Sequence, residues 1–250
     1  MSPTRTIRAR LAVLGLVLAA AACAPLTVTP EIRAAVAAPD RSEADRKTDE
    51  RRFPEKLLAF SRVRPGMKVL DLGAGAGYST EILARAVGAS GVVYGQNSQV
   101  AIDRYLKTRF DDRFAKFALK NVVKVVRPDG DPVPADAAPF DLITIFFAYH
   151  DVAGEGVDRA LFLKRCYDAL KPGGAMMVAD HAAQAGAGTS VTTTLHRIEE
   201  AVVLKDFEAA GFRYAGHADF LRNPDDPRDK PSSRSPIKVD EFLLRFVKPM

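Results

Sequence analysis

The sequence predicts an α/β fold, with a doubly wound, mostly parallel sheet of seven strands and helices on both faces. Two observations predict it. Short, continuously apolar runs alternate with longer amphipathic stretches, the pattern of strands buried on both faces and the helices that cover them. One apolar run also leads directly into three closely spaced glycines, and in a sheet of this kind a ligand lies past the carboxyl ends of the strands.

The expected elements follow from this alternation. The expected strands are short apolar runs, at 67–72, 91–95, 122–126, 140–147, 175–179, 212–221 and 242–247. The expected helices are 42–60, capped by Ser42 and interrupted near Pro54, then 79–87, 157–170 and 195–210. The polar stretch 222–236 is longer than an ordinary hairpin loop, which favours a lid on the substrate side. The alternative is a mobile surface loop.

The first 23 residues have the pattern of an export signal. Arg5, Arg8 and Arg10 precede the apolar run 11–22, which is too short to span a bilayer and ends in small residues that suit a signal peptidase. Cys23 stands where a bacterial lipoprotein carries its lipidated cysteine. An exported lipoprotein tethered to the membrane through Cys23 and a freely secreted periplasmic protein both remain open.

Three parts are expected along the chain: the export signal over 1–23, a flexible linker rich in Pro, Ala and Thr over 24–41, and one folded domain over 42–250. The formal net charge is +5, which falls to +2 when the three arginines of the export signal are set aside. Acids and bases alternate over 45–52, as on a solvated helix face, so no nucleic-acid partner is expected. Cys166 is expected to be a buried residue without a catalytic role.

The glycine segment carries the most information about function. Asp71 ends the apolar run, and Gly73, Gly75 and Gly77 follow it with the spacing G-x-G-x-G, not the G-x-G-x-x-G of a dinucleotide loop. A carboxylate at Asp71 would repel a pyrophosphate and would suit a ligand with an ammonium group. This disfavours a nicotinamide oxidoreductase. It favours S-adenosylmethionine, which carries an ammonium and a sulfonium and no phosphate.

The segment resembles motif I of class I S-adenosylmethionine-dependent methyltransferases, and the resemblance continues through most of residues 55–250, including 139–143 and 170–174. It implies a Rossmann-like fold and S-adenosylmethionine as cofactor. It also implies cofactor-binding roles for Asp71, Gly73, Gly75, Gly77 and Tyr78 in the glycine loop, for Asn97 at the ribose hydroxyls and for Asp129 at the adenine amino group. Asn97 replaces the acid that is usual at its position, and it lacks the strength of a charged acceptor.

A narrower resemblance concerns a bacterial group of predicted, often exported, methyltransferases whose substrate is unassigned. The segments that carry it are 149–151, 180–183, 195–198 and 240–249. The name of that group describes a fold, and its chemistry is open. The resemblance therefore implies export and a methyltransferase fold, without naming an acceptor.

Candidate catalytic residues follow two neighbouring strands. Tyr149, His150 and Asp151 come after the fourth expected strand, and Asp180 and His181 after the fifth, so both groups should open onto the crevice beside the cofactor's methyl group. One of the two histidines is expected to be the base, oriented by a neighbouring carboxylate, and the tyrosine is expected to close the site over the methyl. The alternative is that these side chains brace loops through hydrogen bonds.

A metal is the remaining question. Asp151 and Asp180 resemble the placement of the magnesium ligands in catechol-type methyltransferases, but histidine is a less usual magnesium ligand, and no residue is assigned as a metal ligand. The sequence therefore predicts a methyltransferase that acts on a small-molecule or envelope-associated acceptor. The alternative is an exported, non-catalytic binding or accessory protein with the same fold. Asn97 favours that alternative, as does export, because S-adenosylmethionine is made in the cytoplasm.

Overall fold

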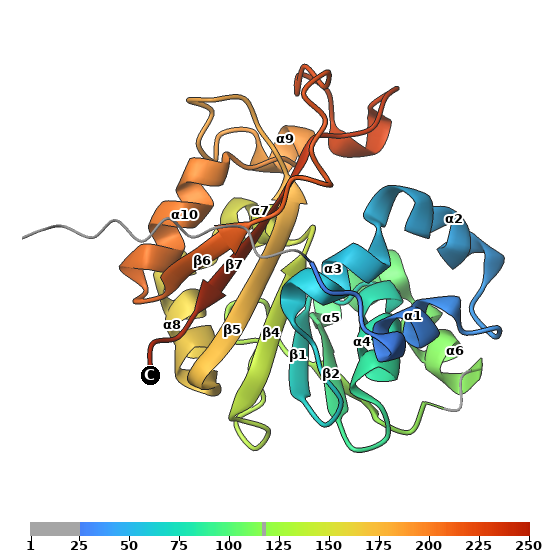
Figure 1. Cartoon of the computed structure of the whole chain (residues 1–250). Helices are drawn as coiled ribbons and strands as arrows, with labels where there is room; N and C mark the ends of the chain where they lie inside the picture. Colours follow the sequence, from blue (N-terminus) through green and yellow to red (C-terminus); the bar gives the residue numbers. More distant parts are fainter. Residues whose placement is uncertain (1–25, 117–118) are drawn as a thin grey trace, which may run out of the picture.

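The computed structural model describes residues 26–116 and 119–250, and in them the chain forms a seven-stranded sheet in the order β3-β2-β1-β4-β5-β7-β6 (Figure 1). Strands β1 to β5 pair in parallel, and β7 is antiparallel to β5 and β6. The predicted fold class is confirmed. The strands are β1 Lys68–Leu72, β2 Val92–Asn97, β3 Val122–Val126, β4 Phe140–Phe146, β5 Leu170–His181, β6 Arg213–His217 and β7 Glu241–Val247.

The strand order reverses between β1 and β4, because β2 and β3 extend to one side of β1 while β4 and β5 extend to the other. The connections from β1 and β4 therefore leave toward opposite faces, and their carboxyl ends leave a crevice where a ligand can bind. Helix α2, helix α9 and the loop between β6 and β7 surround this end of the sheet, at the top of Figure 1. This edge is where the candidate site lies.

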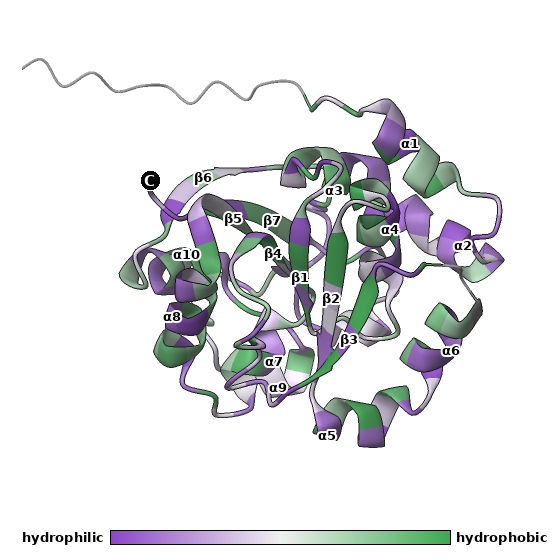
Figure 2. Cartoon of the chain, turned by 90° about the horizontal axis from the view of Figure 1, so that it is seen from below, coloured by the Kyte–Doolittle hydropathy of each residue, from purple (hydrophilic) through white to green (hydrophobic). Residues whose placement is uncertain are grey.

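Helices cover both faces of the sheet and create two hydrophobic cores. Along β1, Leu70 packs with α8 and α10, while its neighbour Val69 packs with α1, α3 and α4. Figure 2 shows the hydrophobic residues concentrated in the strands. The helices and helical turns are α1 Pro30–Ala37, α2 Glu43–Arg52, α3 Pro54–Ser61, α4 Tyr78–Val87, α5 Gln99–Ala101, η1 Ile102–Leu106, α6 Arg109–Lys116, α7 Tyr149–Gly154, α8 Arg159–Ala169, α9 Thr192–Leu195, α10 Glu200–Ala209 and η2 Ser232–Arg234.

The predicted flexible linker over 24–41 is wrong for residues 30–37, which form α1. Thr29 caps the helix, Pro30 occupies its first turn, and Ile32 and Ala35 are buried against the core under α3 and α4. The physical reason is a short apolar stripe that a composition rich in Ala and Pro conceals. The export signal predicted over 1–23, with Cys23, lies outside the described residues. Within the described residues no helix is long and apolar enough to cross a membrane.

Two further expectations need correction. The helix expected over 195–210 begins only at Glu200, because His196 adopts a left-handed backbone conformation with φ 49° and ψ 52°. The charged stretch 45–52 is not simply a solvated face. Asp45 is buried against Arg113 of α6, and Asp49 binds the hydroxyl of Tyr78 at 2.6 Å. These contacts dock α2 against the first turn of α4.

Candidate functional site

The glycine loop turns sharply from β1 into α4, and all three glycines have positive φ, +58° at Gly73, +59° at Gly75 and +86° at Gly77. A Cβ atom on Gly73 would lie 2.8 Å from the Cβ of Ala148, so this part of the loop packs tightly against the segment after β4. A Cβ atom on Gly75 would have no protein atom within 4 Å. The loop therefore presents bare backbone to open space at Gly75.

Two side chains from the end of β2 hold the loop in this shape. The N–H of Gly73 donates to Oε1 of Gln96 at 3.1 Å, and the N–H of Gly75 donates to Oδ1 of Asn97 at 2.9 Å. The amide nitrogen of Asn97 in turn donates to the carbonyl of Gly75 at 3.1 Å. Both ends of the Asn97 amide are thus engaged, and its predicted contact with ribose hydroxyls would share these groups with Gly75.

Asp71 lies fully inside the protein, with 1% of its surface exposed. Its carboxylate accepts hydrogen bonds from the hydroxyls of Ser79 at 2.9 Å and of Thr80 and Thr144 at 2.7 Å. Burial raises the pKa of Asp71, and these hydroxyls and the charge of Arg52 oppose that rise. The side chain ties β1 to α4 and β4. Its predicted direct contact with an ammonium group stays a prediction.

Arg52, the last residue of α2, lies beside the loop without a hydrogen-bond or ion-pair partner among the described residues, and its Nε atom is buried. Its guanidinium carbon lies 4.3 Å from the ring centroid of Phe147 and 5.4 Å from that of Tyr78. Burial lowers the pKa of Arg52, and the neighbouring Arg51 adds to this effect. A desolvated guanidinium held by aromatic rings is a site for an anion.

On the other side of the crevice, Asp180 and His150 form a buried pair. The Oδ1 atom of Asp180 lies 2.7 Å from Nδ1 of His150, and Oδ2 accepts the backbone N–H of His150 at 2.8 Å. Burial lowers the pKa of His150, but the charge and hydrogen bond of Asp180 raise it more, so the net direction is upward. His150 is 3% exposed, and the pairing leaves its Nε2 atom for other partners.

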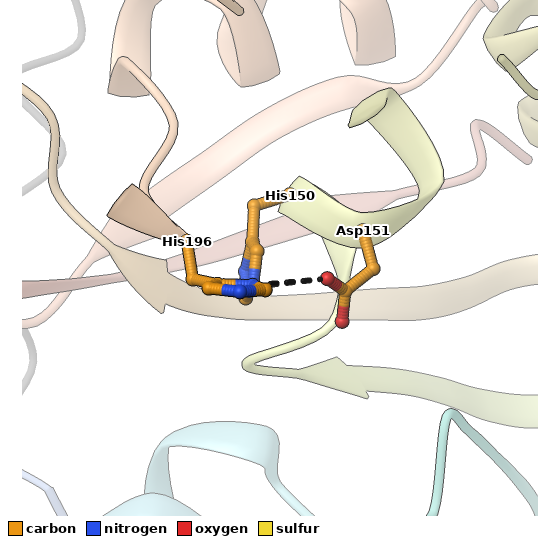
Figure 3. A group of neighbouring side chains, drawn as sticks. All are labelled: His150, Asp151 and His196. Carbon is orange, nitrogen blue, oxygen red and sulfur yellow. Dashed lines mark ion pairs between the residues drawn. The ribbon is translucent and has the colours of Figure 1, made fainter. Parts of the chain in front are cut away.

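The Nε2 atom of His150 faces Asp151 and His196 (Figure 3). It lies 3.3 Å from Oδ1 of Asp151, and Nδ1 of His196 lies 3.4 Å from the same oxygen. The predicted catalytic residues therefore do meet here, with the exception of Tyr149 and His181. His196 joins them because its left-handed backbone directs the side chain back toward α7. Its place at a strand-to-helix connection after β5 is the signal that pointed to this rim.

His181 points to a different part of the rim. Its ring stacks on Phe147 with centroids 5.1 Å apart, and its Nδ1 atom lies 3.2 Å from Oε1 of Glu241. Together with Arg51, Arg52 and residues 232–239 it lines a pocket of about 370 Å³. The loop predicted as a lid, 222–236, thus contributes its second half to a pocket beside the site.

Two predicted site residues take other places. Tyr149 is fully buried among Phe162 and Phe207 on the α8 and α10 face, and its hydroxyl donates to Asp206 at 2.9 Å. The prediction that it closes the site over the methyl is wrong. Asp129 is half-buried after β3, and its negative charge, after burial, raises the pKa of Glu155. Its predicted contact with adenine stays a prediction.

We expect a Tyr149→Phe variant to behave as a change in the core. It loses one hydrogen bond to Asp206, which costs about 1 kcal/mol of the free energy of unfolding. Its affinity for S-adenosylmethionine should be unchanged. Denaturant unfolding and calorimetric titration measure the two quantities. A tenfold loss of affinity at unchanged stability would return Tyr149 to the cofactor site.

The order of the strands, the reversal between β1 and β4 and the glycine loop define the Rossmann-like fold of the class I S-adenosylmethionine-dependent methyltransferases. The family model for protein-L-isoaspartate (D-aspartate) O-methyltransferases matches residues 52–205. The chain belongs to this family.

Relatives and solved structures agree with this assignment. The chain is 34% identical over 118 residues to the ubiquinone/menaquinone biosynthesis C-methyltransferase UbiE of Idiomarina loihiensis, a match that covers 47% of this chain and 44% of the relative. The UbiE protein of Shewanella frigidimarina is 32% identical over 121 residues, covering 48% and 45%. The chain therefore spans less than half the length of these relatives.

Two solved structures share the fold. An S-adenosylmethionine-dependent methyltransferase from Aquifex aeolicus has a TM-score of 0.57 and 22% identity and covers 82% of this chain and 97% of its own. The [4+2]-cyclase SpnF has a TM-score of 0.58 and 20% identity and covers 83% and 81%. A cyclase on this fold means that the fold alone does not decide the reaction.

S-adenosylmethionine is the cofactor of this class, and the residues of the site fit it. Gly75 leaves a cradle that a Cβ atom would fill, which is what a ligand lying against the backbone requires. Arg52 provides a buried, unpartnered guanidinium next to the loop, and the amino-acid part of the cofactor carries a carboxylate. Both ends of the loop thus suit the cofactor.

Proposed function

We propose that the chain transfers a methyl group from S-adenosylmethionine to an acceptor held over the carboxyl ends of β4 and β5. The observation that carries the proposal is the bare backbone at Gly75, open to the crevice, with the unpartnered Arg52 beside it. The C-methyltransferase relatives and the O-methyltransferase family support methyl transfer. Their different acceptor atoms leave the acceptor of this chain as a small-molecule or envelope-associated group.

In this proposal the amino-acid end of the cofactor lies against the glycine loop and its carboxylate pairs with Arg52. The ribose hydroxyls exchange hydrogen bonds with Asn97, and the adenine amino group reaches Asp129. Methyl transfer is an in-line displacement, so the protein's task is to align the acceptor and to remove its proton where it has one. His150, Asp151 and His196 converge on the acceptor side and supply that function, with Asp180 holding His150 in place.

A non-catalytic binding or accessory role is the second candidate. It is favoured by Asn97, whose amide engages Gly75 at both ends and offers a ribose only an uncharged partner. Export, with or without a lipid on Cys23, is part of either proposal. Fractionation of cells that produce the full chain, beside a Cys23→Ser variant, tests it: a lipoprotein requires the parent in the membrane fraction and the variant outside it.

Turnover separates the two candidates. The chain is incubated with methyl-labelled S-adenosylmethionine and with separated small-molecule and envelope fractions of the source cells. An enzyme forms S-adenosylhomocysteine in step with one labelled product, and a His150→Ala variant that still binds the cofactor does not. Saturable cofactor binding without label transfer to any fraction would favour the accessory role.

We expect Arg52→Leu to weaken S-adenosylmethionine binding by roughly tenfold to a hundredfold, because a hydrogen bond to a charged group contributes about 1.5–3 kcal/mol. Arg51→Leu is the matched control, since Arg51 is the adjacent residue of the same helix and its side chain is exposed. Its affinity should stay within about twofold of the parent. Calorimetric titration measures both. Equal affinities for the two variants would contradict the assignment of the carboxylate to Arg52.

A further inference from the structure

His150, Asp151 and His196 bring three donor atoms to one point, and no role has yet been given to that convergence. The measured separations are 3.3 Å from Nε2 of His150 to Oδ1 of Asp151 and 3.4 Å from that oxygen to Nδ1 of His196. All three donor atoms lie within 4.8 Å of one another. Ligands about 2.0–2.1 Å from a tetrahedral metal ion lie about 3.4 Å apart, so both measured separations fit the edges of such a site.

The surroundings of His150 match those of a metal-binding imidazole. Its Nδ1 atom is bound to Asp180, which is completely buried and also accepts the backbone N–H groups of His150 and His181. A carboxylate behind the ring fixes the tautomer, so that Nε2 presents its lone pair to the cluster, and it raises the basicity of that nitrogen. Figure 3 shows the His150 side chain directed at the ring of His196.

The position of His196 gives a second, independent indication. A histidine with φ 49° and ψ 52° is an uncommon backbone state. The next residue, Arg197, is fully buried and binds Asp226 and two backbone carbonyls, so the chain is anchored on that side. The anchored, left-handed turn directs the imidazole at Asp151 instead of into solvent.

We propose that His150, Asp151 and His196 bind one divalent first-row transition-metal ion, with Zn²⁺ as the ion that the donor set fits best. Two imidazoles and one carboxylate suit such ions, whereas Mg²⁺ and Ca²⁺ prefer oxygen ligands. The side chains of Asp151 and His196 are 47% and 50% exposed, so a fourth position faces outward. Three protein ligands with an open position are typical of catalytic metal sites.

The site lies on the acceptor side of the crevice. Ala148, two residues before His150, packs against Gly73 of the glycine loop, and both His150 and Asp180 stand at the ends of the adjacent strands β4 and β5. A metal here would coordinate an acceptor oxygen, nitrogen or sulfur and lower its pKa, which is the proton removal that methyl transfer needs. This catalytic role rests on the proposed function, but metal binding itself does not.

The test uses the full chain, stripped with a chelator and titrated with Zn²⁺ and with Co²⁺ in the absence of S-adenosylmethionine. We expect one equivalent of Zn²⁺ by calorimetry, and Co²⁺ visible absorption with the intensity of a four-coordinate site. His196→Asn removes a ligand and keeps a residue that tolerates the left-handed backbone, so it should fold and bind at least tenfold more weakly. Asp180→Asn should weaken binding roughly tenfold to a hundredfold.

His217→Asn is the matched control. His217 also has an aspartate nearby, with its Nε2 atom 3.7 Å from Asp219, but it lies outside the cluster and should leave binding unchanged. Binding that is absent, unaffected by His196→Asn in a variant with parental circular dichroism, or equally tight for Mg²⁺ would overturn the proposal. A separate titration with S-adenosylmethionine keeps the two proposals apart. A chain that binds the cofactor but no metal refutes the metal site alone, and the reverse result refutes the methyl-donor assignment alone.

Discussion

Replacing Gly75 by alanine is expected to raise the Kd for S-adenosylmethionine at least about tenfold while leaving the protein folded. The added Cβ meets no protein atom within 4 Å, so folding loses only the strain of a non-glycine residue at φ +59°, roughly 1–2 kcal/mol. The same Cβ occupies the space in which the cofactor contacts the backbone. Displacing a ligand from a fitted surface by one methyl group costs about 1–3 kcal/mol.

Gly66→Ala is the control for that strain. Gly66 also has a positive φ, +83°, and its nearest neighbour, Oγ of Ser90, would lie at an ordinary 3.6 Å from the new Cβ. It precedes β1, at the opposite end of the strand from the loop. We expect the two variants to lose similar stability in denaturant unfolding and only Gly75→Ala to lose affinity in calorimetry. Parental affinity in Gly75→Ala would remove the cofactor from the loop.

The second large effect is on stability, at Arg197. This residue is completely buried, pairs with Asp226 at 2.8 Å and donates to the carbonyls of Ala182 and Lys230. Arg197→Met keeps most of the side-chain volume but leaves a buried carboxylate without its cation, which costs about 3–5 kcal/mol of the free energy of unfolding. Thermal or denaturant unfolding measures it.

Arg213→Met is the matched control, because Arg213 is an exposed residue of the edge strand β6. Its effect should stay within about 0.5 kcal/mol. A loss below 1 kcal/mol for Arg197→Met would mean that the contacts of Arg197 do not hold the loop between β6 and β7. Asp226 also accepts the backbone N–H groups of Arg228 and Asp240, so this part of the predicted lid is an anchored segment instead of a mobile surface loop.

The elements that could be predicted from sequence are those whose signal is local. The strand that ends at Asp71 is a continuous apolar run, and the glycines after it mark a backbone that needs positive φ. The order of strands and helices then restricts the sheet to few topologies, since parallel connections are right-handed and neighbours pair. This local information also located the edge of the sheet where the candidate residues gather.

The misplaced residues depend on direction and on tertiary contacts. Tyr149 and His150 are adjacent, and in an extended loop both were expected near the methyl. They instead begin helix α7, where successive side chains point about 100° apart, so His150 faces the crevice while Tyr149 enters the core. The convergence of His196 with Asp151 depends on a left-handed turn anchored by Arg197, which no periodicity in the sequence encodes.

The most direct measurement is calorimetric titration of the purified chain with S-adenosylmethionine, repeated in the presence of S-adenosylhomocysteine and of a nicotinamide dinucleotide. We predict one saturable site that S-adenosylhomocysteine occupies competitively and that the dinucleotide leaves free, because the loop pairs with a carboxylate through Arg52 and lies over the buried charge of Asp71. Displacement of S-adenosylmethionine by the pyrophosphate-containing dinucleotide, or no heat at millimolar S-adenosylmethionine, would contradict it.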